Sequence, residues 1–279
     1  MIAKRKPSRM GPNTESGPTS GPGTGAVILC GGYGTRMKSL TGGRIHKSEI
    51  AFDGKPLIWY TIEMLDPHIV DILSFGVGHH AKRMRRLITE YANAGELPHS
   101  GVKILNHEYG IASKIIEAIR TINAGGSDNI RDIVICNGNE IRHGFSLRDM
   151  HANHVSSGAI ATFAVTDPEN TIGNSMVFEL GKDNAILKGV KRQDLADREL
   201  GSGGWQQHIG VLIMKVSAAE LLLPEHRDWD RGVNLPLVAS GGAQAHRSPG
   251  IIYANVNSEN ELDELMQRLL RDRRAGAGI

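Results

Sequence analysis

A short apolar run that breaks into a glycine-rich loop is the segment of this sequence best suited to phosphate chemistry. Residues 26–30 read AVILC, and the following loop reads GGYGTR and ends on Arg36. Glycines leave backbone N–H groups open to a phosphate because no side chains intervene. Arg36 adds a guanidinium that can hold a phosphate with two hydrogen bonds, and Lys47 adds a compact positive charge. The segment therefore predicts a phosphate-binding site after a buried strand.

Two other phosphate-binding motifs do not fit this loop. The dinucleotide fingerprint needs Gly-x-Gly-x-x-Gly leading directly into a helix, and the P-loop needs Gly-Lys-Ser/Thr. Taken alone, residues 31–36 are also compatible with an ordinary tight turn. The interpretation of the loop therefore depends on the rest of the chain.

Three motifs together resemble the sugar-phosphate nucleotidyltransferase family. Gly31-Gly32-Tyr33-Gly34-Thr35-Arg36-Met37 matches every position of the family's opening motif, and Gly54-Lys55-Pro56 matches the third. The second motif, Pro-Lys-Pro, is reduced to His46-Lys47-Ser48. The resemblance runs from residue 25 to about residue 270. It implies an α/β fold, a Rossmann-like three-layer αβα sandwich with a mainly parallel mixed sheet.

The resemblance also implies roles for residues along the chain. It places Arg36 and Lys47 in catalysis. It implies nucleotide contacts from Gly31, Gly32, Gly34, Thr35 and Gly110, and sugar-phosphate contacts from Lys191 and Gly210. The segment around Gly110, residues 107–112, is similar to the family's base-recognition loop, and a generic strand-to-helix turn is an alternative. The Glu and Pro that flank the family's sugar-phosphate lysine are absent around Lys191.

The two metal positions depart from the family pattern. The resemblance implies Mg²⁺ held by two carboxylates, but Asn139 and Asn255 occupy these positions. An amide oxygen can coordinate Mg²⁺ and brings no charge, so we expect a weakened metal site. Glu140 could replace Asn139 only if the turn is shifted, because neighbouring side chains in extended backbone point to opposite sides. Residues 137–139 are likewise only the amide counterpart of the Asp-x-Asp motif of related glycosyltransferases.

The reaction that the family performs is attack of a sugar-1-phosphate oxygen on the α-phosphorus of an NTP. It forms a nucleoside diphosphate sugar and releases pyrophosphate, and its catalysis depends on positioning and charge neutralisation. Two hypotheses remain: a working nucleotidyltransferase with weakened metal use, or a catalytically lapsed domain that binds nucleotide or sugar phosphate as a regulatory partner. Residues 54–59 and 75–80 look most similar to glucose-1-phosphate cytidylyltransferases. The sequence leaves the base and the sugar open.

Composition restricts the class of protein further. The chain has 279 residues, 40% of them hydrophobic, and we expect one domain over residues 25–270. Residues 1–24 are basic and rich in Pro, Gly and Ser, which predicts disorder, and we expect residues 271–279 to be frayed. The net charge is +2, but the two ends of the chain are basic and the body between them is therefore acidic. We expect no nucleic-acid binding by the domain, because its body carries no excess of positive charge. We expect a cytoplasmic protein without a membrane span, and a homo-oligomer remains open.

Alternating strand and helix patterns place the candidate site in the fold. We expect strands over residues 26–30, 72–76, 103–106, 133–136, 160–165, 176–180 and 210–214. We expect helices over residues 56–65, 81–93, 112–121, 147–155, 217–222 and 259–273. Cys30 and Cys136 end apolar runs, which predicts reduced, buried thiols. Such a sheet binds ligands beyond the carboxyl ends of its strands, where both the glycine loop and residues 137–140 fall.

Overall fold

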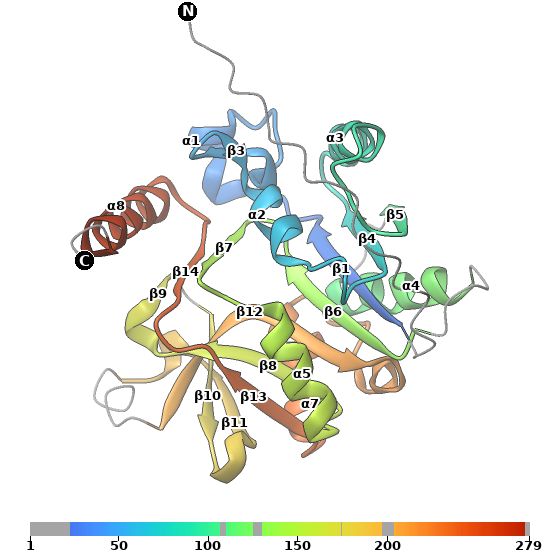
Figure 1. Ribbon diagram of the computed structural model, residues 1–279, viewed down its shortest axis with the longest axis vertical. Helices are drawn as coiled ribbons and strands as arrows, with labels where there is room; N and C mark the ends of the chain where they lie inside the picture. Colours follow the sequence, from blue (N-terminus) through green and yellow to red (C-terminus); the bar gives the residue numbers. More distant parts are fainter. Residues whose placement is uncertain (1–22, 107–109, 125–129, 174, 197–203, 277–279) are drawn as a thin grey trace, which may run out of the picture.

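Strands and helices alternate along most of the chain, as the sequence predicted (Figure 1). The computed structural model describes residues 23–106, 110–124, 130–173, 175–196 and 204–276. Nearly all of the N-terminal tail that we expected to be disordered lies outside these ranges, and the first strand already begins at Thr24. The predicted α/β fold is confirmed.

One nine-stranded sheet forms the centre of the described part of the chain. Its strands are β1 (Thr24–Cys30), β4 (Ile72–Val77), β5 (Gly101–Asn106), β6 (Asp132–Asn137), β8 (Ala161–Thr166), β10 (Met176–Leu180), β11 (Ile186–Lys191), β12 (Trp205–Lys215) and β13 (Ala243–Arg247). The main path is β11-β10-β12-β6-β1-β4-β5, and β8 pairs with β12 and β13. The strands β6, β1, β4 and β5 run parallel, whereas β12 is antiparallel to β6, β8 and β10.

Helices cover both faces of this sheet and make it the middle of three layers. One face packs against α2 (Leu57–Met64), α3 (Ala81–Asn93) and α5 (Leu147–Ser157), and the other packs against α4 (Ile111–Asn123) and α7 (Leu235–Ala239). Alternation along β1 explains this division: Ala26 and Ile28 belong to the first core, and Val27 and Leu29 to the second. Because both faces are buried, the strand reads as a continuous apolar run.

A smaller sheet beside the central one was not predicted. It consists of β7 (Glu140–His143), β14 (Ile252–Asn255) and β9 (Thr171–Ile172), in the order β7-β14-β9. A helix, α8 (Glu259–Gly276), packs Leu265 and Leu269 against Ile141 and Ala254 of this sheet. These strands are too short to show a clear period of two in the sequence. The hairpin of β2 (Ala51–Phe52) and β3 (Lys55–Pro56) was missed for the same reason.

Three differences from the expected elements are larger than a shift of one or two residues. The last predicted strand begins five residues earlier, at Trp205, because Gly210 at φ 67° forms a bulge inside β12 instead of starting it. The predicted helix over residues 217–222 is a 3-10 helix, η6 (Val216–Leu221). The helix α8 continues to Gly276, so the expected domain end at residue 270 falls inside it. Residues 277–279 lie outside the described part.

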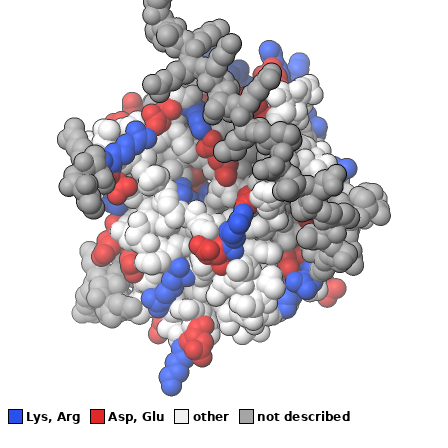
Figure 2. Space-filling model, in the orientation of Figure 1, with Lys and Arg blue, Asp and Glu red and all other residues white. Residues whose placement is uncertain are grey.

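No helix in the described residues is both long and apolar enough to cross a bilayer. On the face shown in Figure 2, acidic and basic side chains are interspersed around a central hollow. Cys30 and Cys136 are free and buried, as predicted, and burial raises the pKa of each thiol to about 12.

Gly138 allows the turn after β6 to pack directly against β1. A Cβ at this position would lie 2.8 Å from the sulfur of Cys30 and 3.1 Å from the hydroxyl of Ser48. We expect Gly138→Ala to lower the free energy of unfolding by about 1–3 kcal/mol, because it overpacks a buried contact. In the control Gly101→Ala the new methyl group meets its nearest neighbour, Ile72, at an ordinary 3.6 Å. Urea denaturation measures both, and equal stability of the two variants would contradict the close approach.

Candidate active site

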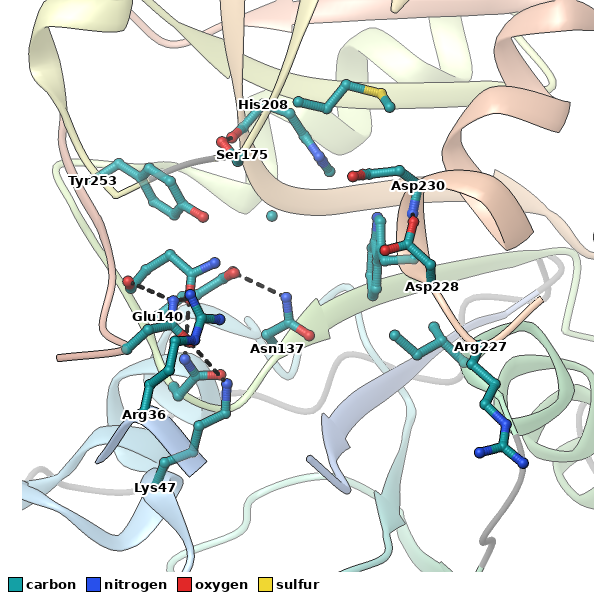
Figure 3. Close-up of a pocket in the computed structure, with 17 residues that line it drawn as sticks. Arg36, Lys47, Asn137, Glu140, Ser175, His208, Arg227, Asp228, Asp230 and Tyr253 are labelled. Atoms are coloured by element: carbon teal, nitrogen blue, oxygen red, sulfur yellow. Dashed lines mark hydrogen bonds between the residues drawn. The ribbon is translucent and has the colours of Figure 1, made fainter. Parts of the chain in front are cut away.

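The glycine loop begins where the central strand β1 ends. Gly34 adopts φ 60°, a left-handed conformation that favours glycine, and leads into the short 3-10 helix η1 (Thr35–Met37). Gly31 has no space for a side chain, since a Cβ there would lie 2.1 Å from the ammonium nitrogen of Lys114. Arg36 and Lys47 extend from this region into one cavity (Figure 3). The structure therefore brings the predicted phosphate-binding groups together.

Hydrogen bonds hold Lys47 in place where the family motif has prolines. Lys47 begins the 3-10 helix η2 (Lys47–Glu49), which His46 caps by accepting the backbone N–H of Ser48 at Nδ1, 3.2 Å away. The other ring nitrogen, Nε2, donates to the carbonyl of Gly32 at 3.1 Å. Burial lowers the pKa of His46 to about 4, so the ring is neutral at pH 7. One imidazole thus ties Lys47 to the glycine loop.

The main cavity has a volume of about 370 Å³ and lies between the glycine loop and β12. Arg36, Lys47 and Glu140 line it on one side, and Asp228 and Asp230 line the opposite wall (Figure 3). Asn139 and Gly210 also belong to its lining. Between these walls lie His208, Trp229, Ser175 and Tyr253. Burial lowers the pKa of His208 to about 4, so its ring is also neutral at pH 7. The cavity combines cationic, neutral polar and acidic surfaces.

A second depression, the glycine-loop hollow, adjoins the main cavity. Its volume is about 330 Å³, and Gly31, Gly32, Gly110, Lys114 and Arg227 line it together with Lys47, Asn137 and Asn139. The last three side chains also line the main cavity. The two spaces are therefore continuous, and a ligand with two ends can occupy both. The rest of the predicted base-recognition loop, residues 107–109, lies outside the described residues.

Three predicted residues lie at the margins of this arrangement. Gly34 and Thr35 line a third hollow, which shares Arg36, Lys47 and Asn257 with the main cavity. Lys191 lies behind the acidic wall, and its ammonium is 3.7 Å from Asp228 and 4.0 Å from Asp230. Lys191 therefore contacts the two carboxylates rather than the main cavity itself.

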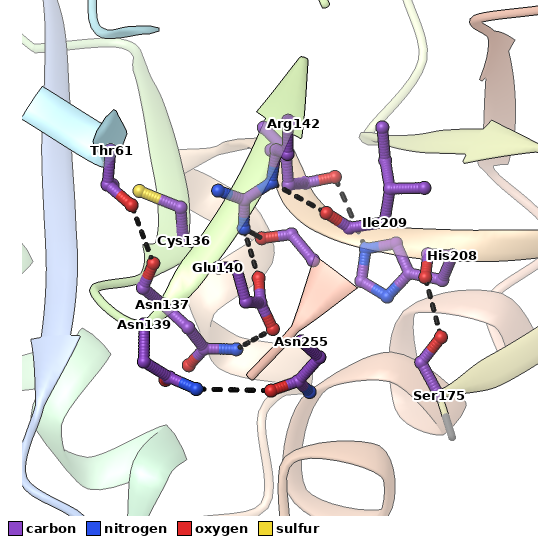
Figure 4. A network of polar contacts seen from close by, with 12 residues as sticks. Thr61, Cys136, Asn137, Asn139, Glu140, Arg142, Ser175, His208, Ile209 and Asn255 are labelled. Atoms are coloured by element: carbon purple, nitrogen blue, oxygen red, sulfur yellow. Dashed lines mark hydrogen bonds and ion pairs between the residues drawn. The ribbon is translucent and has the colours of Figure 1, made fainter. Parts of the chain in front are cut away.

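A buried ion pair supports the polar wall of the main cavity. Glu140 and Arg142, both from β7, form a salt bridge and are almost fully buried (Figure 4). Arg142 also donates to the backbone carbonyls of Ile209 at 2.7 Å and Gly210 at 2.9 Å. Glu140 accepts the side-chain amide of Asn137 at 2.8 Å. Burial raises the pKa of Glu140, and the positive charge of Arg142 opposes this effect. The carboxylate of Glu140 is thus already bound by Arg142 and Asn137.

Gly210 makes room for this ion pair. A Cβ at Gly210 would lie 1.9 Å from a carboxylate oxygen of Glu140, and its φ of 67° also favours glycine. Packing against Glu140 and a positive φ therefore both require glycine at position 210, the residue predicted to contact the sugar phosphate.

Comparison with known proteins identifies the family of this arrangement. Residues 25–177 match the family described as Nucleotidyl transferase, which is more than half of the chain. The chain belongs to the nucleotidyltransferase family. The glycine loop, Lys47 and the turn that carries Asn139 all lie inside the matched region.

Individual relatives of this nucleotidyltransferase are distant. The bifunctional protein GlmU of Pelobacter propionicus is 26% identical over 197 residues, which are 69% of this chain and 40% of that protein. GlmU of Methanococcus maripaludis is 28% identical over 206 residues, which are 72% of this chain and 43% of that protein. The chain thus spans less than half the length of these relatives. The inositol-1-phosphate CTP transferase of T. maritima has the same fold, with a TM-score of 0.64, 16% identity, and coverage of 88% of this chain and 96% of that one.

The two predicted metal positions of this nucleotidyltransferase meet, but as hydrogen-bonding partners. The side-chain amide of Asn139 donates to Asn255 Oδ1 at 3.1 Å and to the carbonyl of Val256 at 3.0 Å (Figure 4). Asn255 Oδ1 also accepts the amide of Asn257 at 2.7 Å. Glu140, the alternative ligand, is held by Arg142, and the described residues contain no group of three or more His, Cys, Asp or Glu arranged for a metal. The side chains of Asn139 and Asn255 are both neutral, and Asn255 Oδ1 already accepts two hydrogen bonds, so this pair does not fit a resident Mg²⁺.

Sequence reasoning missed several residues of this site. Lys114, Arg227, Asp228, Asp230 and Tyr253 line the two spaces and belong to no motif that we recognised. The sequence did contain a sign of Lys114, because it interrupts the apolar face of α4 between Ala112 and Ile115. For the other four residues, the chain gives no comparable pattern.

The Glu140–Arg142 pair allows a quantitative test. We expect Glu140→Gln and Arg142→Met each to lower the free energy of unfolding by roughly 3–5 kcal/mol, because each leaves a buried polar partner unpaired. The double variant should lose clearly less than the sum of the two single variants, since no buried charge remains. Urea denaturation of all four proteins measures the coupling. Strict additivity would show that the two charges do not stabilise each other.

Proposed function

We propose that this protein transfers a nucleotidyl group from an NTP to a sugar-1-phosphate, with release of pyrophosphate. The observation that carries the proposal is the pair of continuous spaces, with the glycine loop, Arg36 and Lys47 at one end and a polar wall at the other. The cationic end suits the phosphate groups of both substrates, and the polar wall suits the hydroxyl groups of the acceptor. Both substrates are metabolites of the cytoplasm, where we therefore expect the protein to act.

The cationic end can stabilise the phosphates during transfer. Arg36 and Lys47 neutralise the charge that develops while an oxygen of the sugar-1-phosphate bonds to the α-phosphorus and pyrophosphate leaves. No covalent bond to the protein is needed, because positioning two bound reactants supplies much of the rate enhancement. Backbone N–H groups of Gly31 and Gly32 can hold the phosphate oxygens from the other side.

The opposite wall is suited to an acceptor rich in hydroxyl groups. Asp228 and Asp230 offer carboxylate oxygens, Lys191 lies behind them, and the neutral ring of His208 adds a polar surface. Trp229 offers an apolar plane of the kind on which sugar rings pack. Because the structurally similar T. maritima protein is named for inositol-1-phosphate, cyclic polyol phosphates belong among the acceptors to test.

A second candidate function rests on one observation. The hydrogen bond between Asn139 and Asn255 occupies the position where the resemblance implies charged metal ligands. This contact favours a domain that has lost turnover and keeps nucleotide or sugar-phosphate binding for regulation. The two functions differ in pyrophosphate release and not in nucleotide binding.

An assay of pyrophosphate release tests the proposed function. The protein is incubated with each NTP, a panel of sugar-1-phosphates and inositol-1-phosphate, with and without Mg²⁺. We expect turnover with at least one pair of substrates, and we expect Lys47→Met to lower kcat/KM by about 100-fold, because it removes a phosphate-binding charge. The control is Lys188→Met, at an exposed lysine of β11. Nucleotide binding without any turnover would instead support the lapsed domain.

Restoring the carboxylates tests the interpretation of the metal positions. We expect Mg²⁺ to leave the melting temperature of the natural protein unchanged and to raise that of Asn139→Asp/Asn255→Asp by about 3 °C or more, because paired carboxylates repel until a cation binds. The control is Asn93→Asp/Asn123→Asp, which adds the same charge at two exposed helix ends. Stabilisation of the natural protein by Mg²⁺ alone would contradict our interpretation.

A further inference from the structure

Lys114 is a buried cation without an anionic partner. Its side chain extends from α4 past Gly76 to Gly31, where glycines leave room for it, and only 7% of the residue is exposed. Within the described residues, no carboxylate and no hydrogen-bond acceptor pairs with its ammonium group. The thiol of Cys30 lies nearby but stays neutral, because burial raises its pKa to about 12.

Burial of an unpaired charge is costly, which makes this position informative. A lysine usually extends its ammonium group into water when its stem is buried. Burial of the charge without a partner destabilises a fold, and burial lowers the pKa of Lys114 accordingly. The surrounding helix positions, among them Ala112 and Ile115, are apolar, so an apolar residue would fit here at lower cost. Such an arrangement is typical of a site whose counter-charge arrives with a ligand.

Among the described residues, the charged side chains that line the glycine-loop hollow around Lys114 are all positive. Lys47, Lys114 and Arg227 line it, and its described lining contains no Asp or Glu. Gly110, at the N-terminus of α4, adds the positive end of that helix to the same hollow. The acidic side chains Glu140, Asp228 and Asp230 line the main cavity, and none of them is among the described residues of the hollow. The hollow is thus suited to an anion of high charge.

We propose that the glycine-loop hollow binds the phosphate chain of the nucleotide through fixed cations, with Lys114 in contact with a phosphate, and without a divalent metal ion. This inference rests on the proposed function for the identity of the ligand. It assigns to Lys114 and Arg227 the neutralising positive charge that a Mg²⁺ ion held by two carboxylates would otherwise supply. Bound Mg²⁺ reduces the charge of a triphosphate, so it competes with these side chains instead of assisting them.

Isothermal titration calorimetry with inorganic tripolyphosphate and with each NTP tests the proposal, in EDTA and in excess MgCl₂. We expect binding in EDTA to be at least as tight as in MgCl₂. Lys114→Met should weaken binding in EDTA by about tenfold or more, because it removes one charge-assisted hydrogen bond. Lys114→Arg, which keeps the charge, should bind more tightly than Lys114→Met. Lys188→Met, at an exposed lysine on β11, serves as the control.

The melting temperature separates a ligand-binding role from a structural one. Lys114→Met removes a buried charge, so the unliganded variant should melt at a higher temperature than the natural protein. A lysine that stabilises the fold predicts the opposite change. If Lys114→Met binds tripolyphosphate as tightly as the natural protein does, the assignment of Lys114 is wrong.

The remaining outcomes distinguish this inference from the proposed function. Binding that requires MgCl₂ overturns metal-free recognition and leaves nucleotidyl transfer standing. Metal-free binding without turnover supports the inference and overturns nucleotidyl transfer. Absence of binding to tripolyphosphate and to every NTP, in both buffers, overturns both. The EDTA titration uses the natural protein, so it decides the question even if a variant fails to fold.

Discussion

The buried ion pair of Glu140 and Arg142 is the contact on which the geometry of the site depends. Arg142 belongs to the small sheet, yet its guanidinium also binds two carbonyls of β12 in the central sheet. Glu140 holds Asn137 at the end of β6. The cost of burying both charges is offset by these additional hydrogen bonds. The turn from Asn137 to Glu140, which carries Asn139, is therefore fixed at both of its ends.

Charge is divided along the site in a way that separates two tasks. The end at the glycine loop is lined by cations, and the far wall by Asp228 and Asp230. A phosphate chain is attracted to the first end and repelled by the second, so the field alone sets the direction in which a nucleotide enters. In our proposal the protein supplies permanent charges where the sequence resemblance implies a metal ion. Permanent charges need no free metal, but one of them, Lys114, stays buried when the ligand is absent.

The sequence predicted the central fold well and the far wall of the site poorly. Long apolar runs such as residues 26–30, and the glycine loop after them, identified both the buried strands and the phosphate end. Short strands such as β7 escaped, because two to four residues do not show a period. Asp228 and Asp230 escaped because a loop packs them against the site from a distant part of the chain. The sequence shows Lys114 as a charged residue on the apolar face of a helix. Only the structure shows that no described residue pairs with its ammonium group.

The cap on Lys47 has a consequence for how the phosphate end behaves. A proline restrains the backbone through its ring at any pH, whereas His46 does so through a hydrogen bond that needs an unprotonated Nδ1. The same imidazole donates a hydrogen bond to the carbonyl of Gly32, so one side chain contacts both the glycine loop and the helix that begins at Lys47. The backbone around Lys47 and the glycine loop are therefore joined through one neutral side chain. Acid strong enough to protonate the ring removes its bond to Ser48 and so breaks this connection.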